Sequence, residues 1–294
     1  MKNNVVKGTL SALIANTIFG FSFLFSKIAL GFADSLVILS VRFTIAFLVL
    51  NILWAFGAIK LDFKGKPKKK IVLMAVAQPL LYFIFELYGI ENTSSALSGV
   101  LISLVPVVVL ILSTVFLKEK PTLKQVIFSA ISLFAVAGIS LLSNDGGVNR
   151  IVGILLLFGA VICAAVFNVL SRSESKHYSA VEKTYMMFLI GTVGFNIISL
   201  LVFRGNYINE FYTAFSSIEF WGAIIYLAVL SSVAAFMLYN YSTSVISSVK
   251  AASFANIVTI VSVVGGILIL GESFSIGQII CCILIIIGVF GVNK

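Results

Sequence analysis

The sequence predicts an all-α integral membrane protein with ten transmembrane helices, arranged as two inverted five-helix repeats. Of its 294 residues, 60% are apolar and only 11% are charged, which lies far from the composition of soluble domains. The apolar residues form ten continuous stretches, each close to the ~20 residues that a helix needs to cross ~30 Å of hydrocarbon. These stretches lack the alternation of barrel strands, so helices are the remaining structure that can span a bilayer.

The predicted spans follow one another with short connections that leave no room for a soluble domain. The first span follows Lys2 and Lys7 as a signal peptide would, but its apolar stretch is long and has no small-residue cleavage pattern, so we expect it to be retained. In chain order the spans cover residues 8–30, 34–56, 71–90, 96–117, 123–142, 151–172, 181–203, 219–241, 249–270 and 274–292.

The net charge of +9 is a signal of topology rather than of nucleic-acid binding. With the N-terminus inside, 16 of the 20 basic residues fall on the inner side, 3 fall on the outer side, and Arg42 lies within the second span. Cytoplasmic loops carry such an excess of basic residues. We therefore expect a multi-pass protein of the cytoplasmic membrane with both termini in the cytoplasm, and we expect the basic run at 64–70 to contact lipid headgroups.

An internal repeat appears when the chain is shifted against itself. A shift of 153 residues superposes LKEKPTLKQV (117–126) on LGESFSIGQI (270–279), and a shift of 145 pairs Gly8 with Gly153 and Lys27 with Arg172. These shifts divide the chain into a first repeat at 1–142 and a second at 151–294. Because each repeat has an odd number of spans, the second enters the membrane from the opposite side, and inverted repeats of this kind place a solute pathway between the halves.

Two ionisable side chains lie clearly inside spans, where a charge costs at least ~2.5–3.5 kcal/mol unless it has a partner or a water-filled cavity. Arg42 lies about 12 Å along the second span from its outer end, and Glu86 lies near the same boundary in the third span. Three readings stay open at this point: a structural ion pair between Arg42 and Glu86, a direct part in handling solute or protons, or Arg42 reaching lipid headgroups from a span whose edge lies elsewhere.

Further polar residues recur at helical spacing and are the candidates for solute contact. Gln78, Tyr82 and Glu86 lie four residues apart, which places them on one helix face. The shift of 153 pairs Glu86 with Tyr239. The predicted substrate-binding residues are Gln78, Tyr82, Glu86, Asn168, Phe236, Tyr239, Asn240 and Asn256, although packing between helices is the alternative role for each asparagine.

Signals for an enzyme are missing from the sequence. Its one histidine, His177, lies in a predicted loop, and no HExxH, GxSxG or phosphate-binding loop occurs. The three cysteines, Cys163, Cys281 and Cys282, lie inside spans, where we expect packing roles rather than metal ligation. We therefore expect no catalytic residues, no metal and no cofactor, and any coupling must come from an ion gradient or from the solute gradient.

Several segments resemble the EamA-type family of the drug/metabolite transporter superfamily. They are FGFSFLFSKIAL (19–30), the arginine-bearing SVRFTIAF (40–47), and YGIENTSSALSGVLISLVPVVVLILSTVFLKEKPTLKQ (88–125), with a hydroxyl-rich turn, Pro106 in the fourth span and Glu119 before the fifth. The resemblance covers nearly the whole chain, but the second half has Thr259 at the proline position. It implies ten-helix carriers built from two repeats, which move amino acids, other metabolites or lipophilic drugs.

The sequence thus favours a secondary transporter that exports a small organic solute, with an amino acid or related metabolite as the first choice and proton coupling through Glu86 left open. A carrier for lipophilic cations is the alternative within this class, favoured by Glu86 and the aromatic residues and opposed by Arg42. A different class is a membrane scaffold that does not transport, or an enzyme acting on lipids, and the missing catalytic set argues against the enzyme.

Overall fold

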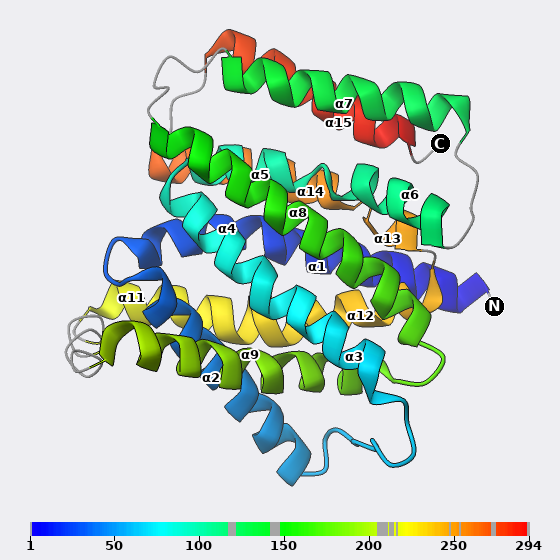
Figure 1. Cartoon of the computed structure of the whole chain (residues 1–294), viewed down its shortest axis with the longest axis vertical. Coiled ribbons are helices and arrows are strands. Elements are labelled where there is room, and N and C mark those ends of the chain that lie inside the picture. The colour runs from blue at the N-terminus through cyan, green and yellow to red at the C-terminus, as the bar shows by residue number, and fades with distance from the viewer. Residues whose placement is uncertain are drawn as a thin grey trace.

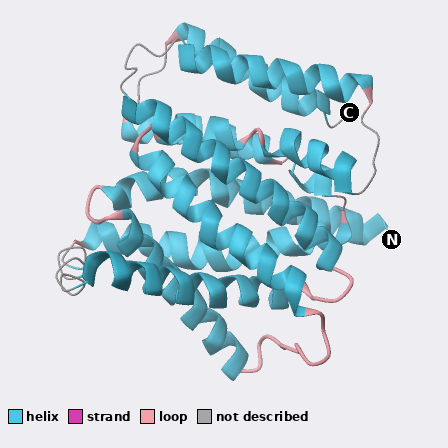
Figure 2. Cartoon of the chain, in the orientation of Figure 1, coloured by secondary structure: helices cyan, strands magenta, loops and turns pink. Residues whose placement is uncertain are grey.

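The computed structural model describes residues 2–116, 122–141, 148–204, 211, 215, 217–246, 248–252, 254–271 and 275–292. Within these ranges the regular secondary structure is helical, and no strand occurs (Figure 2). Eight of the described helical segments are long and apolar enough to cross a membrane. The chain is therefore a multi-pass helical membrane protein.

The helices follow the predicted spans closely at most boundaries. Residues 2–141 form α1 (Lys2–Leu30), α2 (Ser35–Ala55), α3 (Lys68–Ala75), the π-helical segment η1 (Val76–Leu81), α4 (Tyr82–Glu91), α5 (Ser95–Ile102), α6 (Val105–Phe116) and α7 (Leu123–Leu141). Residues 148–292 form α8 (Val148–Glu174), α9 (Ala180–Phe203), α11 (Ile218–Ile225), the π-helical segment η3 (Tyr226–Ala234), α12 (Ala235–Val245), α13 (Ser248–Ala252), α14 (Ala255–Leu270) and α15 (Ile276–Val292).

Side-chain caps explain where several helices begin. The Asp34 carboxylate accepts a hydrogen bond from the Leu36 amide at 2.7 Å and starts α2. Ser179 and Glu182 form a reciprocal capping box at the start of α9. Each cap satisfies backbone N–H groups that have no partner inside the helix. The polar residues between the apolar stretches therefore fix the register at which each helix starts.

Four of the predicted spans depart from a continuous α-helix in the structure. In the third, Gln78 has extended dihedral angles (φ −147°, ψ 116°) just before Pro79, which lacks a backbone N–H group. In the fourth, α5 ends at Ile102 and α6 begins at Val105, one residue before Pro106. The eighth span contains η3, and in the ninth α13 and α14 are separate. The departures from α-helical geometry fall in spans three and four and again in spans eight and nine, and in the eighth the helix itself stays continuous.

The helices of the two halves interleave around the centre of the molecule (Figure 1). Helix α1 packs against α12 and α14, α4 packs against α8, α5 packs against α14, and α2 packs against α9. Helices α7 and α15 pack along each other at one side of the molecule (Figure 1). Most of the tertiary contacts thus join a helix of residues 2–141 to a helix of residues 148–292.

Two glycine contacts are related by the shifts seen in the sequence. A methyl group added at Gly8 of α1 would lie 3.1 Å from the Cβ atom of Val245 at the end of α12. One added at Gly153 of α8 would lie 2.7 Å from Cγ2 of Thr93 and 3.0 Å from Cβ of Asn92, at the end of α4. The two glycines are 145 positions apart, and Asn92 and Val245 are 153 positions apart. The same close approach therefore occurs twice.

Candidate functional site

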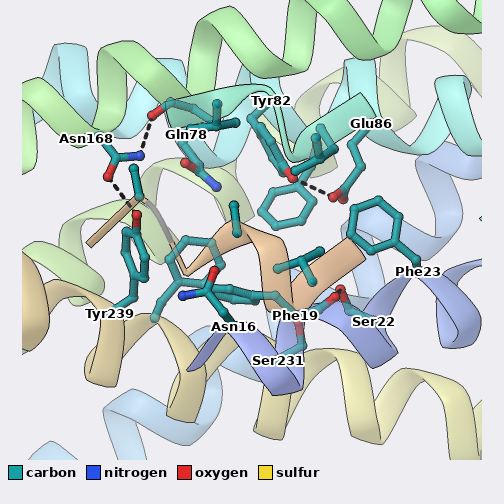
Figure 3. A pocket seen from close by; sticks show the side chains of 18 of the residues that line it. Asn16, Phe19, Ser22, Phe23, Gln78, Tyr82, Glu86, Asn168, Ser231 and Tyr239 are labelled. Carbon is teal, nitrogen blue, oxygen red and sulfur yellow. Dashed lines mark hydrogen bonds between the residues drawn. The ribbon is translucent and has the colours of Figure 1, made fainter. Parts of the chain in front are cut away.

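A cavity of about 70 Å³ lies at the centre of the molecule, large enough for several water molecules or a small polar group. Its wall is formed by side chains from helices of both halves (Figure 3). The lining residues are Asn16, Phe19, Ser22 and Phe23 from α1, Arg42 from α2, Gln78 from η1, Tyr82, Phe83 and Glu86 from α4, Ile102 from α5, Val105 from α6, Ala164 and Asn168 from α8, Ser231 from η3, Phe236 and Tyr239 from α12, Ala252 from α13, and Ala255 and Val258 from α14.

The acidic part of the wall consists of Tyr82 and Glu86, one turn apart on α4. Glu86 is only 4% exposed, and its Oε1 atom accepts a hydrogen bond of 2.6 Å from the Tyr82 hydroxyl (Figure 3). The bond can form because residues four apart on an α-helix share a face, and it fixes the orientation of the Glu86 carboxylate. The second carboxylate oxygen is then available to a group inside the cavity.

The basic part of the wall is the Arg42 side chain, which extends from α2. Its Nε atom donates a hydrogen bond to Ser232 Oγ at 2.9 Å, and Nη2 donates to Ser231 Oγ at 3.2 Å. The guanidinium carbon lies 4.3 Å from the centroid of the Phe83 ring and 5.5 Å from that of Phe43. Two hydroxyl acceptors and two aromatic faces therefore hold this cation, while Nη1 takes part in neither hydrogen bond.

Arg42 and Glu86 line the same cavity without a direct salt bridge between their side chains. The salt bridge found among the described residues is a different one: Lys66 Nζ lies 2.8 Å from Glu182 Oε2, away from the cavity. A buried charge without a charged partner is costly unless other groups compensate it. Serine hydroxyls, the tyrosine hydroxyl and aromatic faces supply part of that compensation here, and the opposite charges of Arg42 and Glu86 also attract each other without direct contact.

A neutral polar pair forms another part of the wall. The Tyr239 hydroxyl of α12 donates a hydrogen bond of 2.7 Å to Asn168 Oδ1 of α8. Asn168 also donates to the backbone oxygen of Ala164 at 2.8 Å, so its orientation is fixed. Figure 3 shows this pair on the opposite side of the cavity from Tyr82 and Glu86. The cavity is thus acidic on one side and neutral on the opposite side.

Aromatic rings cover much of the remaining wall. The centroids of Phe19 and Phe236 lie 4.9 Å apart, and those of Phe83 and Phe236 lie 6.1 Å apart. These rings come from α1, α4 and α12 and offer contact area without hydrogen-bond donors. A solute in the cavity would therefore meet apolar surface between the charged and neutral groups.

Most of the residues singled out in the sequence meet in this cavity. Gln78, Tyr82, Glu86, Asn168, Phe236, Tyr239 and Arg42 all line it. Their roles in solute binding, ion pairing or proton coupling remain predictions. The Asn256 side chain lies outside the described part of the structure.

Asn240 is not brought to the cavity. It is fully buried in a separate group, which we term the Lys183 cluster: Ser171, Lys183, Thr184, Asn240 and Thr243. Its Oδ1 atom accepts a hydrogen bond from Ser171 at 2.9 Å, and its Nδ2 atom donates to Thr184 Oγ1 at 3.0 Å. Asn240 therefore joins α8, α9 and α12.

Sequence reasoning missed several lining residues. Ser22 and Phe23 belong to α1, Phe83 belongs to α4, and Ser231 belongs to η3. A signal was present for α1, since Asn16, Phe19 and Phe23 recur at intervals of three and four residues on one helix face. Phenylalanine in an apolar span carries no such signal, because it is equally expected against lipid. Among the described residues, no cluster of three histidine, cysteine, aspartate or glutamate side chains could hold a metal ion.

Comparison with known proteins agrees with this architecture. The sequence matches the EamA-like transporter family twice, over residues 6–141 and 151–294. It is 33% identical over 298 aligned residues to uncharacterized transporter YcxC of Bacillus subtilis, covering 100% of this chain and 95% of that protein. It is 25% identical to the WAT1-related protein At4g08300 of Arabidopsis thaliana, covering 80% of this chain and 72% of the plant protein.

A protein of known crystal structure has the same fold, with a TM-score of 0.70 and 16% sequence identity over 97% of this chain and 95% of that one. The family matches together span nearly the whole chain, and they fall on the segments whose helices interleave around the cavity. The chain therefore belongs to the EamA-like transporter family and is a membrane transporter of small solutes.

Proposed function

We propose that this transporter carries a zwitterionic solute, an amino acid or a closely related metabolite, across the cytoplasmic membrane by alternating access. The single observation that carries the proposal is the arrangement of Arg42 and Glu86, which are both buried in the wall of one cavity without pairing to each other. A solute with one carboxylate and one ammonium would compensate both charges during transit. A solute with a single charge would leave one of them uncompensated.

The hydrogen bonds of the two residues support this division of roles. The bonds of Arg42 to Ser231 and Ser232 use Nη2 and Nε, which leaves Nη1 to donate to a solute carboxylate. Glu86 accepts the Tyr82 hydroxyl at one oxygen, and the other oxygen is left for an ammonium group. The aromatic rings would contact the apolar part of the solute without trapping it strongly.

The proposal includes two inverted five-helix repeats, at 1–142 and 151–294, with both termini in the cytoplasm. Three observations support the repeats: the family matches twice, Gly8 and Gly153 make corresponding contacts, and the departures from α-helical geometry recur in spans three and four and in spans eight and nine. Such repeats rock against each other around a central site. We expect export as the direction and the proton gradient, through Glu86, as the energy source.

Flux into proteoliposomes tests the solute class directly. The panel contains a neutral amino acid, its methyl ester, its N-acetyl derivative and a lipophilic cation. We expect flux of the amino acid to exceed that of the ester and of the N-acetyl derivative by about tenfold or more, since each lacks a charge-assisted interaction worth about 1.5–3 kcal/mol. Movement of the cation alone would reject the zwitterion proposal and support the lipophilic-cation alternative, which the phenylalanine lining favours.

Variants of Arg42 and Glu86 test which residue recognises which charge of the solute. Arg42→Met should lower flux of the amino acid and spare the ester, whereas Glu86→Gln should lower flux of the amino acid, spare the N-acetyl derivative and flatten the pH dependence of flux. Glu219→Gln is the matched control, because Glu219 is exposed near the start of α11. Arg42→Lys keeps the charge if Arg42→Met folds poorly. Unchanged flux of every solute in both main variants would remove the two residues from the site.

A further inference from the structure

We infer that Lys27 and Arg172 are a pair of latches that close the two ends of the cavity, and that this structure has both latches closed. The inference deepens the proposed function, since it assigns the residues that must separate when the cavity opens to either side. It rests on two sets of hydrogen bonds that occur at opposite ends of the molecule. Neither residue lines the cavity itself.

The first latch joins α1 to the end of α4. Lys27 Nζ donates hydrogen bonds to the backbone oxygens of Ile90 at 2.8 Å and Thr93 at 2.7 Å. The last carbonyl groups of a helix lack partners within the helix and carry the negative end of its dipole, so a lysine is favoured there. The bonds cross from one helix to another, and they hold the C-terminal ends of α1 and α4 together.

The second latch joins α8 to the end of α12 in the same way. Arg172 Nη1 donates hydrogen bonds to the backbone oxygens of Thr243 and Ser244, both at 3.0 Å. Lys27 and Arg172 are 145 positions apart, and Ile90 and Thr243 are 153 positions apart. These are the two shifts that relate the halves of the chain, so the second latch is the counterpart of the first.

Each latch lies one helical turn beyond the cavity wall. Lys27 follows the lining residue Phe23 by four positions, and Ile90 follows Glu86 by four. Four residues of α-helix advance by about 6 Å. The first latch therefore closes the cavity just beyond the side where Glu86 and Phe23 face each other.

The same spacing holds at the opposite end. Arg172 follows Asn168 by four positions, and Thr243 follows Tyr239 by four. Helices α1 and α8 have their C-terminal ends at opposite ends of the molecule (Figure 1). The Lys183 cluster reinforces the second latch, because Lys183 Nζ donates to the Asn240 backbone oxygen at 3.3 Å and to Ser171 Oγ at 3.0 Å.

The two latches predict opposite effects on access to the cavity. Opening one end requires α1 to leave α4, and opening the other requires α8 to leave α12. Removing one cation should therefore favour the state that is open at that end and leave the other end closed. A purely structural role would loosen the fold without any preference for a side.

Cysteine labelling measures this preference. The reporter is Ala164→Cys in the cavity wall, in a background where the buried Cys163, Cys281 and Cys282 are replaced by alanine. An impermeant thiol reagent is applied to right-side-out and to inside-out vesicles. We expect Lys27→Met to raise the labelling rate about tenfold or more from one side only, and Arg172→Met to do so from the other side only.

Conservative variants and a matched control complete the experiment. Lys27→Arg and Arg172→Lys should restore slow labelling from both sides, and Lys7→Met, which alters an exposed lysine of the same helix α1, should leave the rate unchanged. If Lys27→Met or Arg172→Met yields too little folded protein, glutamine replaces methionine. Faster labelling from the same side in both variants, from both sides in either, or from neither side would overturn the latch assignment.

The result is independent of the solute, because labelling needs no substrate. Side-specific labelling together with absent amino-acid flux would retain the latches and reject the zwitterion proposal. Amino-acid flux together with labelling that neither variant changes would do the reverse.

Discussion

Asn168 and Asn240 provide a direct test of which polar residues contact the solute. Both asparagines are buried, with exposed fractions of 3% and 0%, but they belong to different groups. Asn168 lines the cavity and accepts the Tyr239 hydroxyl, whereas Asn240 bonds Ser171 and Thr184 in the Lys183 cluster. Replacing each by alanine in turn separates a role in the cavity from a role in packing.

The expected magnitudes follow from the hydrogen bonds that each change removes. Asn240→Ala removes the bonds with Ser171 and Thr184 and a weaker one to Met187 Sδ from a fully buried cluster. At a net value of about 0.5–1.5 kcal/mol for each of the first two, we expect a loss of about 1–3 kcal/mol in the free energy of unfolding. Asn168→Ala removes the bond from Tyr239 and the local bond to the Ala164 backbone oxygen, but both lie beside a cavity where water can replace them, so we expect a loss of less than about 1 kcal/mol.

For transport we expect the opposite order: Asn168→Ala should change solute transport more than Asn240→Ala. Asn168→Ala frees the Tyr239 hydroxyl and alters the cavity wall, and a change of about 1 kcal/mol in solute binding corresponds to roughly a fivefold rise in KM. Asn240→Ala should leave KM within about twofold of the parent value, because the residue does not face the solute.

The assay pairs the midpoint of thermal unfolding in detergent with KM in proteoliposomes. Asn240→Ala should lower the midpoint by several degrees and Asn168→Ala should not. A raised KM with an unchanged midpoint for Asn240→Ala would refute the reasoning and return Asn240 to the solute site. Thr192→Ala is a control at a partly buried position, because it removes a polar bond to the Phe43 backbone oxygen from a residue that does not line the cavity.

Two further predictions concern topology and stability. Single cysteines in the loop at 64–70 and in the connection at 142–147 should label from opposite sides of the membrane, since the sorting of basic residues depends on those placements, and labelling from one side alone would contradict the inverted repeats. Glu182→Ala should lower the free energy of unfolding by about 1–3 kcal/mol, because the carboxylate caps α9 and pairs with Lys66. If thermal unfolding shows that Glu182→Ala and Lys66→Met are both as stable as the parent protein, this prediction is wrong.

The membrane class and most helix boundaries could be predicted from the sequence, because bilayer thickness sets the length of an apolar helix and polar caps mark its ends. The spacing of Gln78, Tyr82 and Glu86 also identified one wall of the cavity, since residues four apart on an α-helix share a face. That wall survives the interruption at Gln78, because the extended residue still leaves all three side chains lining the cavity.

The rotation of each helix about its axis was decided by tertiary packing. Tyr239 and Asn240 are neighbours, and successive helical residues point about 100° apart. Both are polar, so the sequence could not select the one that faces the cavity. Packing of α12 against α1 and α9 turns Tyr239 toward Asn168 and Asn240 toward Thr184.

The relation between Arg42 and Glu86 likewise depended on the fold. The sequence placed two ionisable side chains of opposite sign in adjacent predicted spans, and a structural ion pair was one of the readings. The tertiary structure instead brings Ser231 and Ser232, which are 189 and 190 positions away in the chain, to the guanidinium group. Contacts over such separations arise only when the halves pack together, because no local periodicity encodes which helices of the two halves become neighbours.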